Sequence, residues 1–201
     1  MKKSDLLSLL LEAFPKASHQ ALRFVVLPSC DVDWTEPLPN PVAQLDCDYV
    51  IESVAWSPCG QFLASGSRDE TVRIWRFDST TCASEEVCVL EGHTFWVTSV
   101  SWSPCGQFLA SGSKDSTVRI WSFNCVTRQS REVAMLQGRM GTVWSVVWSL
   151  CAKFLALGDR ICSFDSLTNQ VEVVVDFQPL ALWVNSESWS PCGRFLASGS
   201  Y

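Results

Sequence analysis

The chain has 201 residues, of which 47% are hydrophobic and 18% are charged, so it is long enough for one sizeable core or two small ones. A net charge of −6 argues against direct binding to nucleic acid and against an anionic membrane surface. No apolar run in the sequence approaches the ~18 residues of a membrane-spanning helix.

The first 41 residues lie outside the repeats described below and are expected to form a helix followed by a linker. Ser4 can cap a helix over residues 5–14, and Pro15 ends it. Its apolar residues fall on one face: Leu6, Leu7, Leu10, Leu11 and Phe14. We expect this face to pack on the rest of the protein, with docking to a partner as the alternative. Residues 24–27 suggest an edge strand, and residues 38–41 a linker.

Lys2 and Lys3 followed by leucines resemble the start of a secretory signal. The apolar run is short, however, and no small-residue cleavage site follows it. We therefore expect a cytoplasmic or nuclear protein with reduced thiols.

Four copies of one motif follow in the sequence. Residues 54–77 read VAWSPCGQFLASGSRDETVRIWRF, and residues 100–123 read VSWSPCGQFLASGSKDSTVRIWSF. A third copy, VVWSLCAKFLALGDRICSF, spans 146–164, and a fourth, ESWSPCGRFLASGSY, starts at 187. The first Trp of each copy stands at 56, 102, 148 and 189, so the spacings are 46, 46 and 41. The short interval reflects five residues missing from the third copy, at the turn equivalent to 113–117.

Each copy predicts four short strands. In the second copy these are residues 97–102, 108–111, 117–123 and 132–136, which are rich in β-branched and aromatic residues. Pro and Gly in Ser-Pro-Cys-Gly suit a type I turn between the first two strands. In the third copy, Gly158-Asp159 can close a tight two-residue hairpin. No segment of helical period separates the strands, which excludes βαβ folds.

Four strands in a unit of about 40–46 residues is typical of a β-propeller blade. The motifs Gly92-His93, S-P-x-G, L-A-S-G-S, the turn Asp and V-R-I-W resemble those of the WD40 repeat family, over roughly residues 42–201. The chain departs from the family where Cys replaces Asp in S-P-D-G, and where Trp75-Arg76 and Trp121-Ser122 replace Trp-Asp. The resemblance implies an all-β, partial propeller with blades at about 51–90, 96–137, 143–176 and 183–201.

In the family, a hydrogen-bonded set of His, Ser, Asp and Trp locks each blade. The second copy has all four, as His93, Ser111 (with Ser113 as the alternative), Asp115 and Trp121. The first copy has Ser65, Asp69 and Trp75, but Cys47-Asp48 stands near its His position. The third copy has Arg139 in place of His and Cys162 in place of Trp.

These residues are expected to be structural, with no catalytic, cofactor or metal site. Ser and Asp recur in the first copy without a His, which argues against a catalytic triad. Four of the ten Cys occupy equivalent turns, at Cys59, Cys105, Cys151 and Cys192. Repetition therefore explains them better than disulfide pairing or convergence on one zinc ion.

A propeller removes its exposed sheet edges by closing into a ring, typically of about four to eight blades. Three blades and half of a fourth predict an open arc. Residues 42–45 could form a leading outer strand that pairs beside the hairpin of residues 183–200. Alternatively, two chains could assemble into one ring, and open edges would also allow self-association.

The resemblance implies a non-catalytic scaffold that binds other proteins or peptides. In the family, partners dock on the loops before each first strand and on the turns that bear the Asp. Here those positions hold Arg68, Glu70, Phe95, Trp96, Lys114, Arg139, Met140 and Trp183. Two alternatives stay open: a truncated or degenerate fragment without independent function, and a regulatory subunit of an enzyme complex.

Overall fold

The structure is a computed structural model that describes residues 21–24, 43–46, 49–78, 81, 83–138, 141–158, 160–177 and 184–200. All regular elements in these ranges are β-strands. Accordingly, they contain no helix long and apolar enough to cross a membrane. The helix predicted for residues 5–14 and the linker predicted for 38–41 lie outside the described residues.

Among the described strands, three antiparallel sheets have four strands each, ordered as in the sequence or in reverse. The first sheet contains β3 (Ile51–Trp56), β4 (Phe62–Ser67), β5 (Val72–Phe77) and β6 (Ser84–Leu90). The second sheet contains β7 (Val97–Trp102), β8 (Phe108–Ser113), β9 (Thr117–Asn124) and β10 (Gln129–Gln137). The third sheet contains β11 (Val147–Trp148), β12 (Phe154–Ala156), β13 (Arg160–Asp165) and β14 (Gln170–Asp176).

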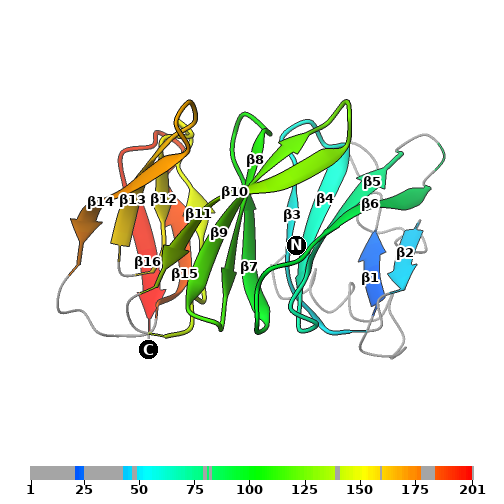
Figure 1. Ribbon diagram of the computed structural model, residues 1–201, viewed down its shortest axis with the longest axis horizontal. Coiled ribbons are helices and arrows are strands. Elements are labelled where there is room, and N and C mark those ends of the chain that lie inside the picture. Colours follow the sequence, from blue (N-terminus) through cyan, green and yellow to red (C-terminus); the bar gives the residue numbers. More distant parts are fainter. Residues whose placement is uncertain are drawn as a thin grey trace, which may run out of the picture.

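Two further sheets in the described part of the chain have two strands each. The N-terminal sheet pairs β1 (Ala21–Phe24) with β2 (Ala43–Asp46), and the fourth sheet pairs β15 (Val184–Trp189) with β16 (Leu196–Ser200). Figure 1 shows the N-terminal sheet beside the first sheet and the fourth sheet at the opposite end of the molecule. The predicted all-β, partial-propeller fold is therefore confirmed, as an open row of sheets.

One prediction about the N-terminal strands needs correction. The structure describes a strand at 21–24, which shares only Phe24 with the edge strand predicted at 24–27, and residues 25–27 lie outside the described residues. The strand predicted at 42–45 is present at 43–46, but it pairs with β1 and not beside the hairpin formed by β15 and β16. The reason is local, because β1 offers a partner strand on the same side of the molecule, whereas the hairpin lies at the other end (Figure 1).

The Ser-Pro-Cys-Gly segment fixes the turn between the first two strands of a sheet. Gly106 has φ 71°, a left-handed conformation that favours glycine, and its N–H donates to the Ser103 carbonyl at 2.8 Å. The Ser103 hydroxyl oxygen accepts the Phe108 N–H at 3.0 Å, so it closes the turn a second time. The third copy has Ala152 in place of the glycine and still adopts φ 57°, which costs stability.

Burial of aromatic side chains between neighbouring sheets holds the row together. Trp102 of the second sheet is 7% exposed and belongs to a hydrophobic cluster that also contains residues of the first sheet, such as Phe62. The Phe62 and Phe123 rings cross that junction edge to face at 5.0 Å. The next junction repeats this arrangement with Phe108 and Phe164, at 4.9 Å. Each such aromatic contributes roughly 2–3 kcal/mol or more through the apolar area it removes from water.

The third sheet departs from the repeat as its sequence predicts. The Leu157 N–H donates to the Arg160 carbonyl at 2.9 Å and so closes the short hairpin around Gly158. Cys162 fills the Trp position and is fully buried. The indole N–H of Trp148 is buried and has no hydrogen-bond partner among the described residues, whereas that of Trp102 donates to the Ala55 carbonyl at 3.1 Å.

Candidate partner-binding face

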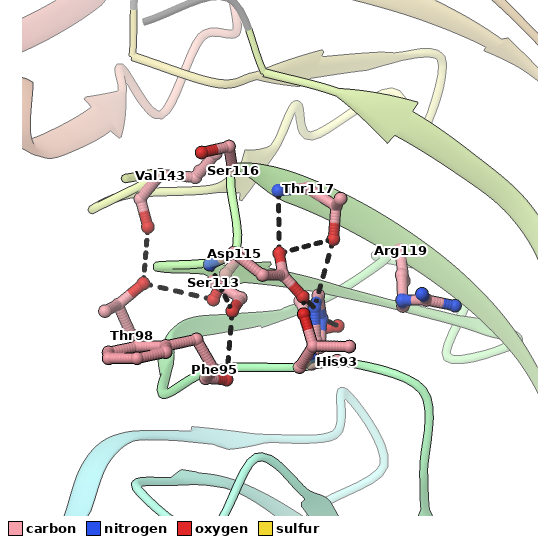
Figure 2. A network of polar contacts seen from close by, with 12 residues as sticks. His93, Phe95, Thr98, Ser113, Asp115, Ser116, Thr117, Arg119 and Val143 are labelled. Carbon is pink, nitrogen blue, oxygen red and sulfur yellow. Dashed lines mark hydrogen bonds and ion pairs between the residues drawn. The ribbon is translucent and has the colours of Figure 1, made fainter. Parts of the chain in front are cut away.

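A buried hydrogen-bond chain joins four side chains of the second sheet. The Trp121 indole N–H donates to the Ser111 hydroxyl oxygen at 2.9 Å. Ser111 lies 2.8 Å from His93 Nε2, and His93 Nδ1 lies 2.8 Å from Asp115 Oδ2. Figure 2 shows the imidazole between the Asp115 carboxylate and the sheet. The structure thus brings together His93, Ser111, Asp115 and Trp121.

One assignment of protons satisfies the whole chain. Because Trp121 already donates to Ser111, the Ser111 hydroxyl can donate its own proton to His93 Nε2. His93 is then neutral and donates from Nδ1 to Asp115. Burial is the main cause that lowers the pKa of His93 below its usual 6.5, and the neighbouring Asp115 only partly opposes it.

Asp115 connects the loop before β7 to the turn before β9. It accepts from the Thr94 N–H at 3.0 Å, the Thr117 N–H at 2.8 Å and the Thr117 hydroxyl at 2.6 Å. Burial acts to raise the pKa of Asp115, but the hydrogen bonds from Thr117, Thr94 and His93 outweigh it and lower the pKa to about 2. The carboxylate therefore stays ionised and clamps both segments.

Burial argues against a hydrolytic role for this set. Ser111 is 0% exposed and His93 6% exposed, so a substrate cannot reach the hydroxyl. Ser111 also shares its oxygen with the Trp121 N–H, an arrangement suited to joining strands. The alternative residue, Ser113, instead accepts from the Asp115 N–H at 3.0 Å and donates to the Phe95 carbonyl at 3.0 Å (Figure 2).

The first sheet replaces the missing His with an arginine. The Trp75 indole N–H donates to Ser65 at 2.9 Å, as in the second sheet. Asp69 accepts from Thr71, and its other oxygen lies 2.6 Å from Arg73 Nη1. Partial burial acts to raise the pKa of Asp69, but the hydrogen bonds from Thr71 and Arg73 lower it. The residue pattern did not indicate this role for Arg73, because the family places a His before the first strand of the sheet, and Arg73 lies on the third strand.

A row of alternating cations and aromatic rings crosses the loops above the first three sheets. The Arg68 guanidinium lies 4.1 Å from the centre of the Trp96 ring, and the Lys114 ammonium lies 4.0 Å from it. Lys114 also lies 5.0 Å from the Trp144 ring. We call Arg68, Trp96, Lys114 and Trp144 the Trp96 ladder.

The repeat explains how the Trp96 ladder forms. Arg68 and Lys114 occupy the same turn position in two successive sheets, just before the turn Asp. Each is held by a backbone hydrogen bond, from Arg68 to the Val50 carbonyl and from Lys114 to the Trp96 carbonyl, both at 2.9 Å. A cation of one sheet therefore reaches an aromatic residue of the next, where cation–π attraction contributes about 0.5–2 kcal/mol.

The predicted face residues fall into three groups. Arg68, Trp96 and Lys114 are in the ladder, and Phe95 stacks on Trp96 with ring centres 5.7 Å apart. Glu70 is exposed nearby, in the turn before β5, and has no contact with these residues among the described interactions. Arg139, Met140 and Trp183 lie outside the described residues. Trp144 was missed, although its position two residues from Thr142 in the same loop was a usable signal.

Electrostatics differ between the two cations of the ladder. Arg68 Nε lies 2.5 Å from Glu52 Oε1, so its charge is already paired. Lys114 makes no ion pair within the described part of the chain, and its ammonium is held by two aromatic rings. In the described ranges, no group of three or more His, Cys, Asp or Glu side chains could hold a metal ion.

The family model of the WD domain, G-beta repeat (WD40) matches three segments of the chain, residues 40–76, 84–122 and 180–201. These segments contain most strands of the first two sheets and the whole fourth sheet. The third sheet lies in the unmatched stretch, in agreement with its missing turn and its Cys162.

Two solved structures share the fold. A chain from a crystal structure of the mitotic checkpoint complex matches with a TM-score of 0.62 and 23% identity, over 80% of this chain and 49% of that one. Sqt1 from Saccharomyces cerevisiae matches with a TM-score of 0.57 and 15% identity, over 63% of this chain and 35% of Sqt1. This chain therefore spans about half of the first structure and about a third of the second.

Proposed function

We propose that this chain, of which three segments match the WD40 repeat model, is a non-catalytic scaffold that binds a protein or peptide at the Trp96 ladder. The observation that carries the proposal is the ladder itself, which combines arginine, lysine and two tryptophans on one face. Tryptophan and arginine are the residue types that most often dominate binding energy at protein interfaces.

Lys114 has no ion pair within the described residues, and this suggests the chemistry of the partner. A carboxylate that approaches the ladder can pair with the Lys114 ammonium, while apolar atoms beside it cover Phe95, which is 46% exposed. The buried hydrogen-bond set around Asp115 fixes the turn that presents Lys114, so the cation is positioned before binding. We therefore propose a partner segment that carries Asp or Glu next to an apolar residue.

Quantitative affinity purification from cells tests this proposal. Trp96→Ala removes the central ring and should lose the specific partners, and Lys114→Glu should lose them as well. Val126→Ala is the matched control, because Val126 is 85% exposed in the turn between β9 and β10, at the other end of the second sheet. An identical partner set for Trp96→Ala and the wild type, with both proteins folded by circular dichroism, would contradict the assignment.

We also propose a reducing compartment, the cytoplasm or the nucleus, for the protein. The exposed residues Cys59, Cys105 and Cys151 occupy equivalent turns of three different sheets. Each lies 3.2–3.3 Å from the Ser hydroxyl two residues before it, so repetition accounts for their position. Labelling of free thiols in the protein from lysed cells checks this.

A further inference from the structure

An open cavity of about 1090 Å³ lies where the first two sheets meet. Its walls are the turn between β7 and β8, the turn between β9 and β10 with the adjoining strand ends, and one residue of β6. The Trp96 ladder stands on the turns and loops at the opposite end of these sheets, so the cavity is a separate feature. Its volume is close to the upper end of the range for small-molecule sites, about 300–1,000 Å³.

Three cysteines from three separate segments line this cavity. Cys88 comes from β6, Cys105 from the turn between β7 and β8, and Cys125 from the turn between β9 and β10. Cys88 is half-buried, and its Sγ accepts from the Ser130 hydroxyl at 3.5 Å. Burial is the main cause that raises the pKa of Cys88, so this thiol stays protonated and unreactive. The two exposed thiols, Cys105 and Cys125, are therefore the candidates for chemistry.

The charge of the cavity is positive. Among the described residues that line it, the only charged side chains are Arg128 and Arg131. Arg128 Nη1 lies 3.2 Å from Glu85 Oε2 of β6, and both side chains are exposed. An exposed ion pair of this kind adds little stability, so a carboxylate of a ligand can take the place of Glu85. Arg131 makes no ion pair within the described part of the chain. A cleft lined in this way attracts anions.

The repeat accounts for Cys105 and for its hydrogen bond. Cys59 occupies the same turn of the first sheet and is also exposed. The Ser103 hydroxyl lies 3.2 Å from Cys105 Sγ, and the Ser57 hydroxyl lies 3.3 Å from Cys59 Sγ. Each serine oxygen already accepts the N–H of the first residue in the next strand, so its own proton is available to the sulfur. Cys59 is therefore an internal control, with the same local contact as Cys105.

The charges near these turns are not part of the repeat. Where the second sheet has Arg131, the first and third sheets have an acid, Glu85 and Glu172. Where the second sheet has Arg128, the third has Asn169, and both residues have φ 57°. The backbone is thus the same while the charge changes sign or disappears. The positive cavity belongs to the second sheet and needs an explanation of its own.

We propose that Cys105 is a site of reversible modification by a small anionic thiol, held in this cavity as a mixed disulfide, for which glutathione is the probe. The Cys105 thiolate attacks one sulfur of glutathione disulfide. A bond forms between Cys105 Sγ and that sulfur, the S–S bond of the reagent breaks, and the second glutathione leaves as a thiolate that takes up a proton. The carboxylates of the bound tripeptide pair with Arg128 and Arg131. Reduced glutathione reverses the step.

Other roles for these thiols fit less well. Within the described residues, no group of three or more His, Cys, Asp or Glu side chains could hold a metal ion. Cys105 and Cys125 are both free thiols that line one cavity, with no hydrogen bond between them among the described interactions. We assign the reaction to Cys105 because the Ser103 hydroxyl can donate to its thiolate, and a hydrogen bond of this kind favours the charged form.

Reaction with two disulfides of opposite charge tests the proposal on the full chain. Glutathione disulfide is anionic and cystamine is cationic, and both react by the same exchange. Mass spectrometry that locates each adduct gives the rates at Cys105 and at Cys59. The ratio of the Cys105 rate to the Cys59 rate should be at least about tenfold higher with glutathione disulfide than with cystamine, which is the lower end of the effect of charged clefts on association. Equal ratios for the two reagents would overturn the proposal.

Exchange of the two arginines for the residues of the third sheet tests their part in the site. Arg128→Asn and Arg131→Glu, combined in one chain, introduce side chains that the repeat already accepts at these positions. The preference of Cys105 for glutathione disulfide should disappear. Lys153→Gln is the matched control, because it removes a cation from the turn between β11 and β12, which does not line the cavity, and it should keep the preference. A preference that persists in the double variant, folded by circular dichroism, would contradict the proposal.

The position of the adduct tests the choice of nucleophile. Cys105→Ser should remove the adduct that forms fastest with glutathione disulfide, and Cys125→Ser should keep it. Both residues are exposed in turns, so neither change disturbs the core. An adduct that forms on Cys125 in place of Cys105, or at the same rate on Cys59 and Cys105, would show that the assignment is wrong.

Discussion

At the scale of single residues, Ser65 and Ser111 show how one copy of the repeat acquires a stronger lock than another. Both hydroxyls accept a Trp indole N–H at 2.9 Å. Only Ser111 also contacts a histidine, which continues the chain of hydrogen bonds to Asp115. Ser65 therefore hydrogen-bonds one buried polar group, the Trp75 N–H, and Ser111 hydrogen-bonds two, the Trp121 N–H and His93 Nε2.

We expect Ser111→Ala to destabilise the protein about twice as much as Ser65→Ala. Each buried polar group left without a partner costs about 1–3 kcal/mol, and Ser111→Ala leaves both the Trp121 N–H and His93 Nε2 without one. Urea unfolding of the two variants measures the difference, and each serves as the control for the other. Equal losses would mean that the His93 contact contributes nothing to stability.

The buried His93 predicts that stability falls in mildly acidic solution. Its pKa is lowered in the folded state by burial, so between its folded pKa and about 6.5 the unfolded chain binds more protons. The contribution of His93 to the free energy of unfolding is complete above pH 6.5. It decreases as the pH falls below that value, by at most about 1.4 kcal/mol per pH unit. Asp115, with a pKa of about 2 in place of 3.8, contributes above pH 4 and loses its contribution only below it.

Melting temperatures measured between pH 8 and pH 5 check this prediction. The wild type should melt at a lower temperature as the pH falls below 6.5. His93→Gln should be less stable at pH 8 but should lose the added pH dependence. A steep decline that persists in His93→Gln would assign the effect to another group.

At the scale of elements, the glycine at the end of the second strand sets how closely two sheets approach. Gly66→Ala and Gly112→Ala place a methyl group 2.7 and 2.8 Å from a Val of the next sheet, so the sheets must shift apart. We expect each to cost about 1–3 kcal/mol, as overpacking of a core does. Gly199→Ala meets no atom closer than 4.0 Å and should leave the unfolding of the monomer unchanged.

Thermal unfolding of the three alanine variants, at a protein concentration where the chain is monomeric, checks this prediction. If Gly199→Ala lost as much thermal stability as Gly66→Ala, backbone freedom and not contact between sheets would be the reason that glycine is required at this position.

At the scale of the whole molecule, the stability of an open row of sheets depends on whether its outermost sheets contact another chain. If copies of the chain associate through exposed sheet edges, the folded state gains stability by mass action as the protein concentration rises. We then expect the melting temperature to rise by a few degrees over a hundredfold increase in concentration. Differential scanning calorimetry over that range checks this, and a constant value for the wild type would contradict self-association.

The sequence by itself determined the strands, their turns, the set of His93, Ser111, Asp115 and Trp121, and the short hairpin at Gly158, because spacing and residue type act locally within one repeat. The partners that cross from one sheet to the next were decided only by the tertiary structure. Trp144 joins the Trp96 ladder because the loops of neighbouring sheets meet in space. Within the first sheet, the pairing of Arg73 with Asp69 was also not evident from the residue pattern. The pairing of β2 with β1 was likewise a matter of proximity in space, which a repeat pattern alone does not specify.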